Sequence, residues 1–217
     1  MSFTEDYLIN KNIKNIVHIG ADRGGELPQY KNLGAKKVVW VEANPDVYGE
    51  LLENLKIMNI SEVQSIPFNQ LISDTDDAST EFNIYYGSDA GHLIGNKGMS
   101  SMLKAEYPVS ECYKGTLELN ALTLDTFLER NELGSDFDMV NIDTQGAEFK
   151  VLKGASKLLE KVNYINCEVT FHSPLYQNNS TFGEVNCLLE SYGFKRIHVD
   201  YCTEGNWGDA LYTKEAL

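Results

Sequence analysis

The sequence of 217 residues is short of positive charge. Its 18 lysines and arginines stand against 32 aspartates and glutamates, which gives a formal net charge of −14. A surface of this sign repels phosphate backbones and anionic lipids, and no dense basic patch in the sequence offsets it. We therefore expect neither a nucleic-acid partner nor a membrane partner.

Paired cysteines and long apolar runs are also missing. The four cysteines are widely spaced, with no CxxC pair and no histidine at a zinc-ligand offset, so neither a zinc site nor a redox pair is indicated. No run approaches the roughly 18 apolar residues of a membrane span, and the first residues lack the basic start and apolar stretch of a signal peptide. We expect reduced thiols and a cytoplasmic protein.

What the sequence does contain is enough apolar side chain for one sizeable core, at 42% hydrophobic and 11% aromatic residues. This predicts a single α/β domain over residues 1–217. Apolar, strand-like runs alternate with helical patterns. The runs cover residues 15–19, 37–41, 62–67, 137–142, 162–169, 194–199 and 210–212. The alternation predicts a mostly parallel sheet flanked by helices, with an antiparallel hairpin formed by the last two strands at one edge.

Three helices carry clear local signals. Asn44 and Pro45 have the residue types of an N-cap and a first helical position, so a helix is predicted after the second strand. A second amphipathic helix is predicted from Ala147 through Leu159, and a third over residues 182–192, stopped by Gly193.

The stretch between residues 82 and 122 breaks this alternation. Two short strand-like pieces, 82–86 and 116–119, flank a segment rich in Gly, Ser and Met at residues 87–104. Long segments of this kind in compact domains are usually functional or mobile. We predict an inserted loop and hairpin region that closes over the site and brings Ser100 or Ser101 to the substrate; a passive surface loop is the alternative.

Polar residues follow the predicted strands where each strand ends. In an open α/β sheet, ligands bind beyond these carboxyl ends, near the point where the strand order reverses. The candidates are Gly20, Ala21, Asp22, Gly24 and Glu26 after the first strand, Glu42 after the second, Asn69 after the third, Asp143 and Gln145 after the fourth, and Glu168 and His172 after the fifth.

The loop after the first strand differs from the dinucleotide fingerprint GxGxxG. Asp22 and Glu26 would place carboxylates where a pyrophosphate must sit, whereas a cationic ligand suits them. S-adenosylmethionine carries a sulfonium and an ammonium group. Glu42 lies about 20 residues past the loop, where an acidic residue binds ribose hydroxyls in related folds.

These segments together resemble the FkbM family of class I S-adenosylmethionine-dependent methyltransferases. The resemblance spans about residues 15–200 and is most specific at Asn141-Ile142-Asp143-Thr144-Gln145-Gly146-Ala147-Glu148, with Val151-Leu152-Lys153-Gly154-Ala155 following. Its other parts are Val17 to Glu26, Val41 to Pro45, Leu71 to Asp74, Ser100 to Leu103 and Leu122 to Asp125. It implies a seven-stranded, Rossmann-like methyltransferase sheet and O-methylation of a sugar, glycan or polyketide hydroxyl.

Two positions depart from the family pattern. His18 replaces the acidic residue that many class I enzymes have before the first glycine, and we expect it to be a hydrogen-bonded residue of the core or site lining. Asn141 stands where many relatives have Lys, which removes a positive charge near Asp143.

Methyl transfer to a hydroxyl needs alignment and a base. His172, beside Glu168, is the first candidate for the base and Asp143 is the second. His172 as a plain surface residue, and Asp143 as a ligand of the cofactor's methionine part, are the alternatives. Gln145 is expected at the substrate.

No metal is predicted, because Asp143 and Glu168 supply only two carboxylate ligands. Two other functions stay open: an inactive cofactor-binding module and a nucleotide-binding oxidoreductase domain.

Overall fold

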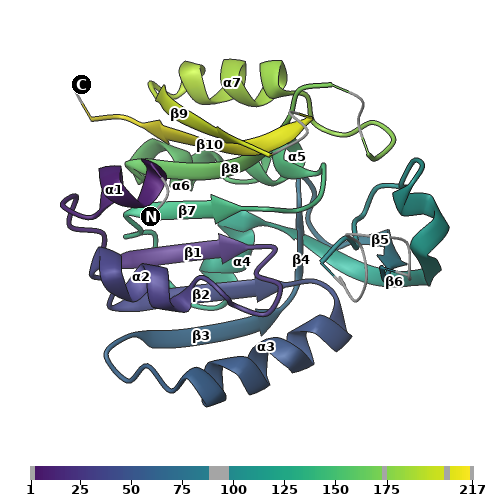
Figure 1. Ribbon diagram of the computed structural model, residues 1–217, viewed down its shortest axis with the longest axis horizontal. Coiled ribbons are helices and arrows are strands. Elements are labelled where there is room, and N and C mark those ends of the chain that lie inside the picture. The colour runs from purple at the N-terminus through teal and green to yellow at the C-terminus, as the bar shows by residue number, and fades with distance from the viewer. Residues whose placement is uncertain (1–2, 88–97, 173–174, 203–205, 216–217) are drawn as a thin grey trace.

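The computed structural model describes residues 3–87, 98–172, 175–202 and 206–215, which form two sheets (Figure 1). The larger sheet has seven strands in the order β3-β2-β1-β7-β8-β10-β9. Its strands are β1 (Asn15–Ile19), β2 (Lys37–Glu42), β3 (Gln64–Asn69), β7 (Met139–Ile142), β8 (Tyr164–Thr170), β9 (Lys195–Tyr201) and β10 (Trp207–Thr213).

Pairing in this sheet is parallel from β3 to β8, and β10 runs antiparallel to both β8 and β9. The predicted seven-stranded, mostly parallel sheet with an antiparallel edge hairpin is confirmed. The chain order reverses at β1, which pairs with β2 on one side and β7 on the other. The carboxyl ends of β1 and β7 therefore flank the crevice in which such sheets bind ligands.

Helices cover both faces of the sheet (Figure 1). They are α1 (Phe3–Leu8), α2 (Leu27–Leu33), α3 (Pro45–Met58), α4 (Leu124–Arg130), α5 (Glu148–Lys153), α6 (Ser156–Lys161) and α7 (Phe182–Ser191). Alternate strand residues serve opposite faces: Ile16 packs in one core with residues of α1, α2 and α3, whereas Val17 packs in another with residues of α4 to α7. Along the described residues, none of the helices has the length and apolarity to cross a bilayer.

Local sequence explains the helix ends. The Asn44 side chain accepts a hydrogen bond from the Asp46 N–H at 3.1 Å, with Pro45 in the first turn, so the predicted cap of α3 is confirmed. The single helix predicted from Ala147 to Leu159 is wrong, because the structure divides it into α5 and α6 at Gly154. The Gly154 backbone lies against Ser73, whose carbonyl oxygen is 2.2 Å from where a Cβ would sit, and this contact fixes the break.

The smaller sheet is the inserted region, with strand order β4-β6-β5. It consists of β4 (Leu71–Ser73), β5 (Ala78–Tyr85) and β6 (Tyr113–Thr123), and a 3₁₀ turn, η2 (Val109–Cys112), precedes β6. The predicted strand pieces are thus parts of longer strands. Figure 1 shows β5 and β6 beyond the carboxyl ends of the larger sheet. Of the predicted closing loop, residues 88–97 lie outside the described residues, and Met99 is buried against the insert.

Candidate active site

A cavity of ≈ 800 Å³ lies at the carboxyl ends of the parallel strands. Both sheets, the loop after β1, helix α1 and strand β10 contribute to its walls. It collects these predicted site residues: Gly20, Asp22, Glu26, Glu42, Ser100, Asp143, Gln145 and Glu168. The other predicted residues do not line it: Ala21, Gly24, Asn69, Ser101 and His172. Most, but not all, of the candidates that were chosen because they follow strand ends therefore lie in this cavity.

The turn after β1 packs directly on the end of β7. Gly20 has φ +78°, and a Cβ built there would lie 1.7 Å from the carbonyl oxygen of Asp143. The Gly20 and Ala21 N–H groups donate to the Val41 carbonyl at 2.9 and 3.1 Å, which ties the turn to β2 as well. Gly24 (φ +67°) serves packing against α3, since its Cβ would meet Leu51 at 2.7 Å. The fold itself requires these glycines.

Glu42 forms the wall at the end of β2. Its side chain is 8% exposed, and its two oxygens accept the N–H groups of Asp22 at 3.0 Å and Asn44 at 2.8 Å. Burial raises the pKa of Glu42 to about 7, although these N–H groups act in the opposite direction. Each oxygen keeps a second lone pair for a ligand hydroxyl. Asn69 stabilises this corner from outside, donating to the Glu42 and Ala43 carbonyls at 2.8 and 3.0 Å.

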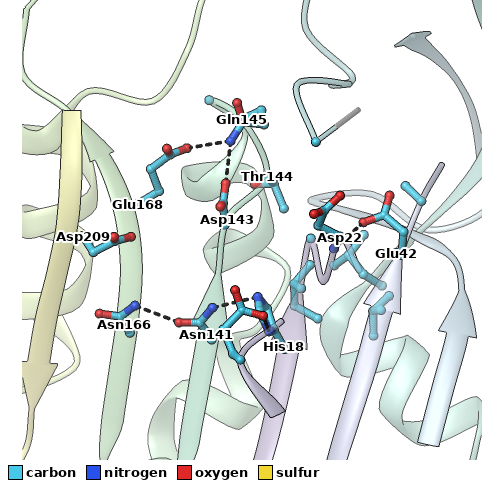
Figure 2. A pocket seen from close by; sticks show the side chains of 18 of the residues that line it. His18, Asp22, Glu42, Asn141, Asp143, Thr144, Gln145, Asn166, Glu168 and Asp209 are labelled. Atoms are coloured by element: carbon cyan, nitrogen blue, oxygen red, sulfur yellow. Dashed lines mark hydrogen bonds and ion pairs between the residues drawn. The ribbon is translucent and has the colours of Figure 1, made fainter. Parts of the chain in front are cut away.

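Two carboxyl groups at the ends of β7 and β8 share one amide (Figure 2). The Gln145 Nε2 lies 2.7 Å from Asp143 Oδ1 and 3.3 Å from Glu168 Oε2. Burial raises the pKa of Asp143, and it raises that of Glu168 further because the charges of Asp143 and Glu148 add to it. Neighbouring buried carboxyls do not both ionise readily, because the charge of each raises the pKa of the other.

The turn that carries Gln145 is braced from below. Gln145 itself has φ +55°, an uncommon conformation for a residue with a side chain. Buried Glu148 accepts the N–H groups of Thr144 at 3.0 Å and Gly146 at 2.9 Å, and the hydroxyl of Ser101 donates to the Gln145 carbonyl at 2.9 Å. Glu148 and Ser101 therefore act on the site by positioning Gln145.

A row of hydrogen-bonded side chains forms the floor of the cavity (Figure 2). The Asn166 amide donates to Asn141 Oδ1 at 2.8 Å, the Asn141 amide lies 2.8 Å from His18 Nε2, and His18 Nδ1 lies 3.1 Å from the Tyr30 hydroxyl. Burial lowers the pKa of His18 to about 4, so the ring is neutral at pH 7. His18 is a site-lining residue of the kind expected from its apolar strand.

Sequence reasoning missed several residues of this region. Tyr30, Asn166 and Asp209 all line the cavity, from α2, β8 and β10. A usable signal existed for Asn166, because it and Glu168 alternate with buried Ile165, Cys167 and Val169. Polar side chains at every second position of a central strand mark a face that a helix does not cover.

The first candidate for the base lies elsewhere. His172 is exposed and lines a separate cavity of ≈ 350 Å³ together with Phe171, Phe182 and Tyr201. Among the described residues, no three His, Cys, Asp or Glu side chains are grouped so as to hold a metal ion.

The sequence profile of the FkbM methyltransferase domain matches residues 18–196 of this chain. No curated protein sequence matches it significantly. The matched range contains both sheets except for β10, the first part of β1 and most of β9, and it includes every residue of the predicted site.

Solved structures share the fold. One is magnesium protoporphyrin IX methyltransferase from Synechocystis PCC 6803 with bound S-adenosylmethionine (TM-score 0.54, 10% identity, 98% of this chain and 76% of that chain). Another is a protein of the NADB-Rossmann superfamily from Streptococcus agalactiae (TM-score 0.53, 12% identity, 98% and 68%). A third is a proposed RNA methyltransferase from Pyrococcus horikoshii (TM-score 0.50, 13% identity, 98% and 84%). At these identities the likeness concerns the fold alone.

Proposed function

Because the chain belongs to the FkbM family of S-adenosylmethionine-dependent methyltransferases, we propose that it methylates a hydroxyl oxygen of a small-molecule or glycan acceptor, of the sugar or polyketide type. The observation that carries the proposal is the carboxyl pair of Asp143 and Glu168, held by Gln145 in the same cavity as the Gly20 turn. One cavity thus combines a place for the methyl donor with a proton acceptor for the hydroxyl.

The residues at the β1 and β2 ends suit the methyl donor. S-adenosylmethionine supplies an electrophilic methyl group on a positively charged sulfur. Glu42 has the free lone pairs to accept the ribose hydroxyls, and the Gly20 turn allows close backbone approach. Asp22 Oδ1 is inaccessible to solvent and has no hydrogen-bond partner among the described residues, so it offers an acceptor for the donor's ammonium group.

The carboxyl pair supplies the base. A hydroxyl must release its proton as its oxygen forms the new bond, and the ionised member of the pair can take that proton. A raised pKa makes such a carboxylate a better proton acceptor, and general-base catalysis contributes about 10²–10⁴-fold to the rate. Gln145 keeps the two carboxyls in register through the hydrogen bonds given above. His172, in its separate cavity, is the second candidate.

Ser100 and Ser101 have different parts in this proposal. Ser100 lines the cavity, with its Oγ 3.2 Å from the Tyr85 N–H that donates to it, and is the serine placed to meet the acceptor. Ser101 is 1% exposed and acts through Gln145.

The two other functions make different predictions. A nucleotide-binding oxidoreductase domain would accept a pyrophosphate at the turn after β1, where Asp22 and Glu26 both line the cavity. An inactive module would bind the donor without any turnover. The hydrogen bonds from Gln145 to Asp143 and Glu168 favour an active enzyme over such a module, because they hold a carboxylate base in the cavity.

Two measurements test the proposed function. First, S-adenosylhomocysteine is expected to raise the melting temperature whereas NAD is not, because ligands that bind only the folded state stabilise it. Second, a homocysteine-release assay across hydroxylated sugars and polyketide alcohols is expected to show turnover, with the methyl group on oxygen. Stabilisation by NAD alone would instead support the oxidoreductase function, and methylation on nitrogen would contradict the O-methyltransferase.

A further inference from the structure

The charged side chains that line the cavity are all acidic among the described residues. Among the described residues that line it there is no lysine and no arginine. Its carboxyl groups are those of Glu5, Asp22, Glu26, Glu42, Asp143, Glu168, Asp200 and Asp209. The only basic side chain in this lining is His18, which is neutral at pH 7. The methyl donor brings one net positive charge, which leaves most of this negative charge uncompensated.

Three of these carboxyl groups form a row across neighbouring strands, away from the donor's turn. Glu168 on β8 stands opposite Asp209 on β10, and Asp209 stands opposite Asp200 on β9. From β1 to β8 there are two strand spacings of about 4.8 Å, so the row begins roughly 10 Å from the strand that leads into the Gly20 turn. Like charges directly opposite each other destabilise an antiparallel pair. A cationic ligand would relieve this repulsion.

The middle of the row has no partner in the protein. Asp209 makes no hydrogen bond or ion pair through its carboxyl group with another described residue, and burial, with the charge of Asp143, raises its pKa to about 6. Asp200 is held by the Thr4 hydroxyl at 3.1 Å and lies 3.2 Å from His198 Nε2. The open group is thus Asp209, which Figure 2 shows pointing into the space beside Glu168.

A second, uncharged acceptor lies below Asp209. The amide N–H of Asn166 donates a hydrogen bond to Asn141. The Oδ1 of Asn166 is inaccessible to solvent and has no hydrogen-bond partner among the described residues. Figure 2 shows this oxygen on the side of Asn166 that faces away from Asn141. A buried acceptor without a donor is costly. Asp209, Glu168 and Asn166 therefore present acceptors to whatever enters this end of the cavity.

We propose that the acceptor substrate carries a protonated amino group, which binds among Glu168, Asp209 and Asn166 while its hydroxyl faces Asp143. This rests on the proposed function and names the substrate class: amino sugars and amino alcohols, in place of phosphorylated or carboxylated acceptors. The amine stays protonated and unmethylated, since it serves only for binding. Asn141 fits this assignment, because a lysine at that position would place a positive charge beside the row.

Matched acceptors test the proposal. Glucosamine and its β-1,4-linked dimer are compared with their N-acetylated forms and with glucosamine 6-phosphate, in the homocysteine-release assay and by calorimetry on the complex with S-adenosylhomocysteine. The amines are expected to bind to this complex. Their kcat/KM is expected to exceed that of the N-acetylated forms by about tenfold or more, because one charge-assisted contact contributes about 1.4 kcal/mol or more. Equal or better binding or turnover of the N-acetylated or phosphorylated forms would overturn the proposal, as would no binding of the amines.

Asp209→Asn separates recognition from folding. The variant keeps the shape of the side chain, and it is expected to weaken amine binding, or raise the KM for the amine, by about tenfold or more while kcat and the affinity for S-adenosylhomocysteine stay near wild type. Undiminished amine binding in this variant would overturn the proposal. Failure of S-adenosylhomocysteine to bind the wild-type protein would instead count against the proposed function, so the two failures are distinguishable.

Discussion

The pKa values of acidic residues are shifted in opposite directions in the cavity and on the outer surface. On the surface, Asp77 pairs with Arg130 at 2.6 and 2.8 Å, and this contact lowers the pKa of Asp77 to about 2. Glu62 is paired with Lys31 at 2.9 Å, which lowers its pKa. In the cavity, Glu42 and Asp209 have raised pKa values and meet no lysine or arginine among the described lining residues.

The difference shows that the negative charge of the cavity is a property of its architecture. The chain has 18 lysines and arginines, and surface carboxylates such as those of Asp77 and Glu62 form ion pairs with them. Most of the cavity carboxylates come from strand ends and an uncovered sheet face, and no lysine or arginine is among the described residues that line the cavity with them. The surface pairs contribute little to stability, whereas the unpaired cavity groups are held at a cost that ligand binding offsets.

Gly20→Ala gives the largest expected effect. The new Cβ would meet the Asp143 carbonyl at 1.7 Å in a left-handed conformation, so we expect a loss of about 3–5 kcal/mol in the free energy of unfolding, with loss of S-adenosylhomocysteine binding. Gly193→Ala is the matched control outside the cavity: φ is +85° but no atom lies within 4 Å, so about 1–2 kcal/mol is expected. Equal losses in urea unfolding would refute the close packing at Gly20.

Glu168→Gln tests the base. It removes one member of the carboxyl pair and keeps the size of the side chain, so we expect kcat to fall by about 10²–10⁴-fold with little change in donor affinity. His172→Ala, in the separate cavity, is the comparison and is expected to retain kcat within about threefold, less than the general-base contribution. If His172→Ala causes the larger fall in kcat, the base assignment reverses.

Glu42→Gln tests the donor end. We expect binding of S-adenosylhomocysteine to weaken by about 1–3 kcal/mol, because a neutral amide accepts ribose hydroxyls less strongly than a carboxylate. With a pKa of about 7, Glu42 gains its charge as the pH rises through neutrality, so wild-type affinity should increase between pH 6 and 8. Calorimetry over this range should find a flatter profile in the variant; parallel profiles would remove Glu42 from the donor site.

Asp209→Asn has a smaller, stabilising effect in the absence of ligands. The folded pKa of about 6 exceeds the unfolded value of 3.8, so the contribution of Asp209 to the stability of the wild type is most favourable below pH 3.8 and falls as the pH rises to about 6. The variant lacks this loss and should be about 1–2 kcal/mol more stable above pH 6. Asp77→Asn, on the surface, should instead destabilise slightly, most visibly against wild type above pH 4. Thermal unfolding that showed the same sign for both variants would contradict the comparison.

Much of the fold could be predicted from the sequence, because apolar runs and caps are local signals. The strands at Asn15–Ile19 and Lys37–Glu42, and the Asn44 cap, follow from adjacent residues. The division at Gly154 could not be predicted, since it depends on Ser73, which is far away in the chain. The same holds for β4, a three-residue strand defined by its pairing with β6.

The site was predictable where it follows strand ends, as at Asp143 and Glu168. The uncovered sheet face was not, because Asp209 becomes a neighbour of Glu168 only through insertion of β10 between β8 and β9. The sequence also could not show which of the two adjacent serines lines the cavity. In the structure Ser100 lines it, and Ser101 is buried beneath it.

A crystal structure of the protein with S-adenosylhomocysteine tests the central claim most directly. The account predicts that the ribose hydroxyls bind Glu42, that the sulfur lies beside Asp143 and Glu168, and that the space next to Asp209 remains open for the acceptor. A ligand lying across Asp209 and Asn166, or no ligand in the cavity at saturating concentration, would contradict it.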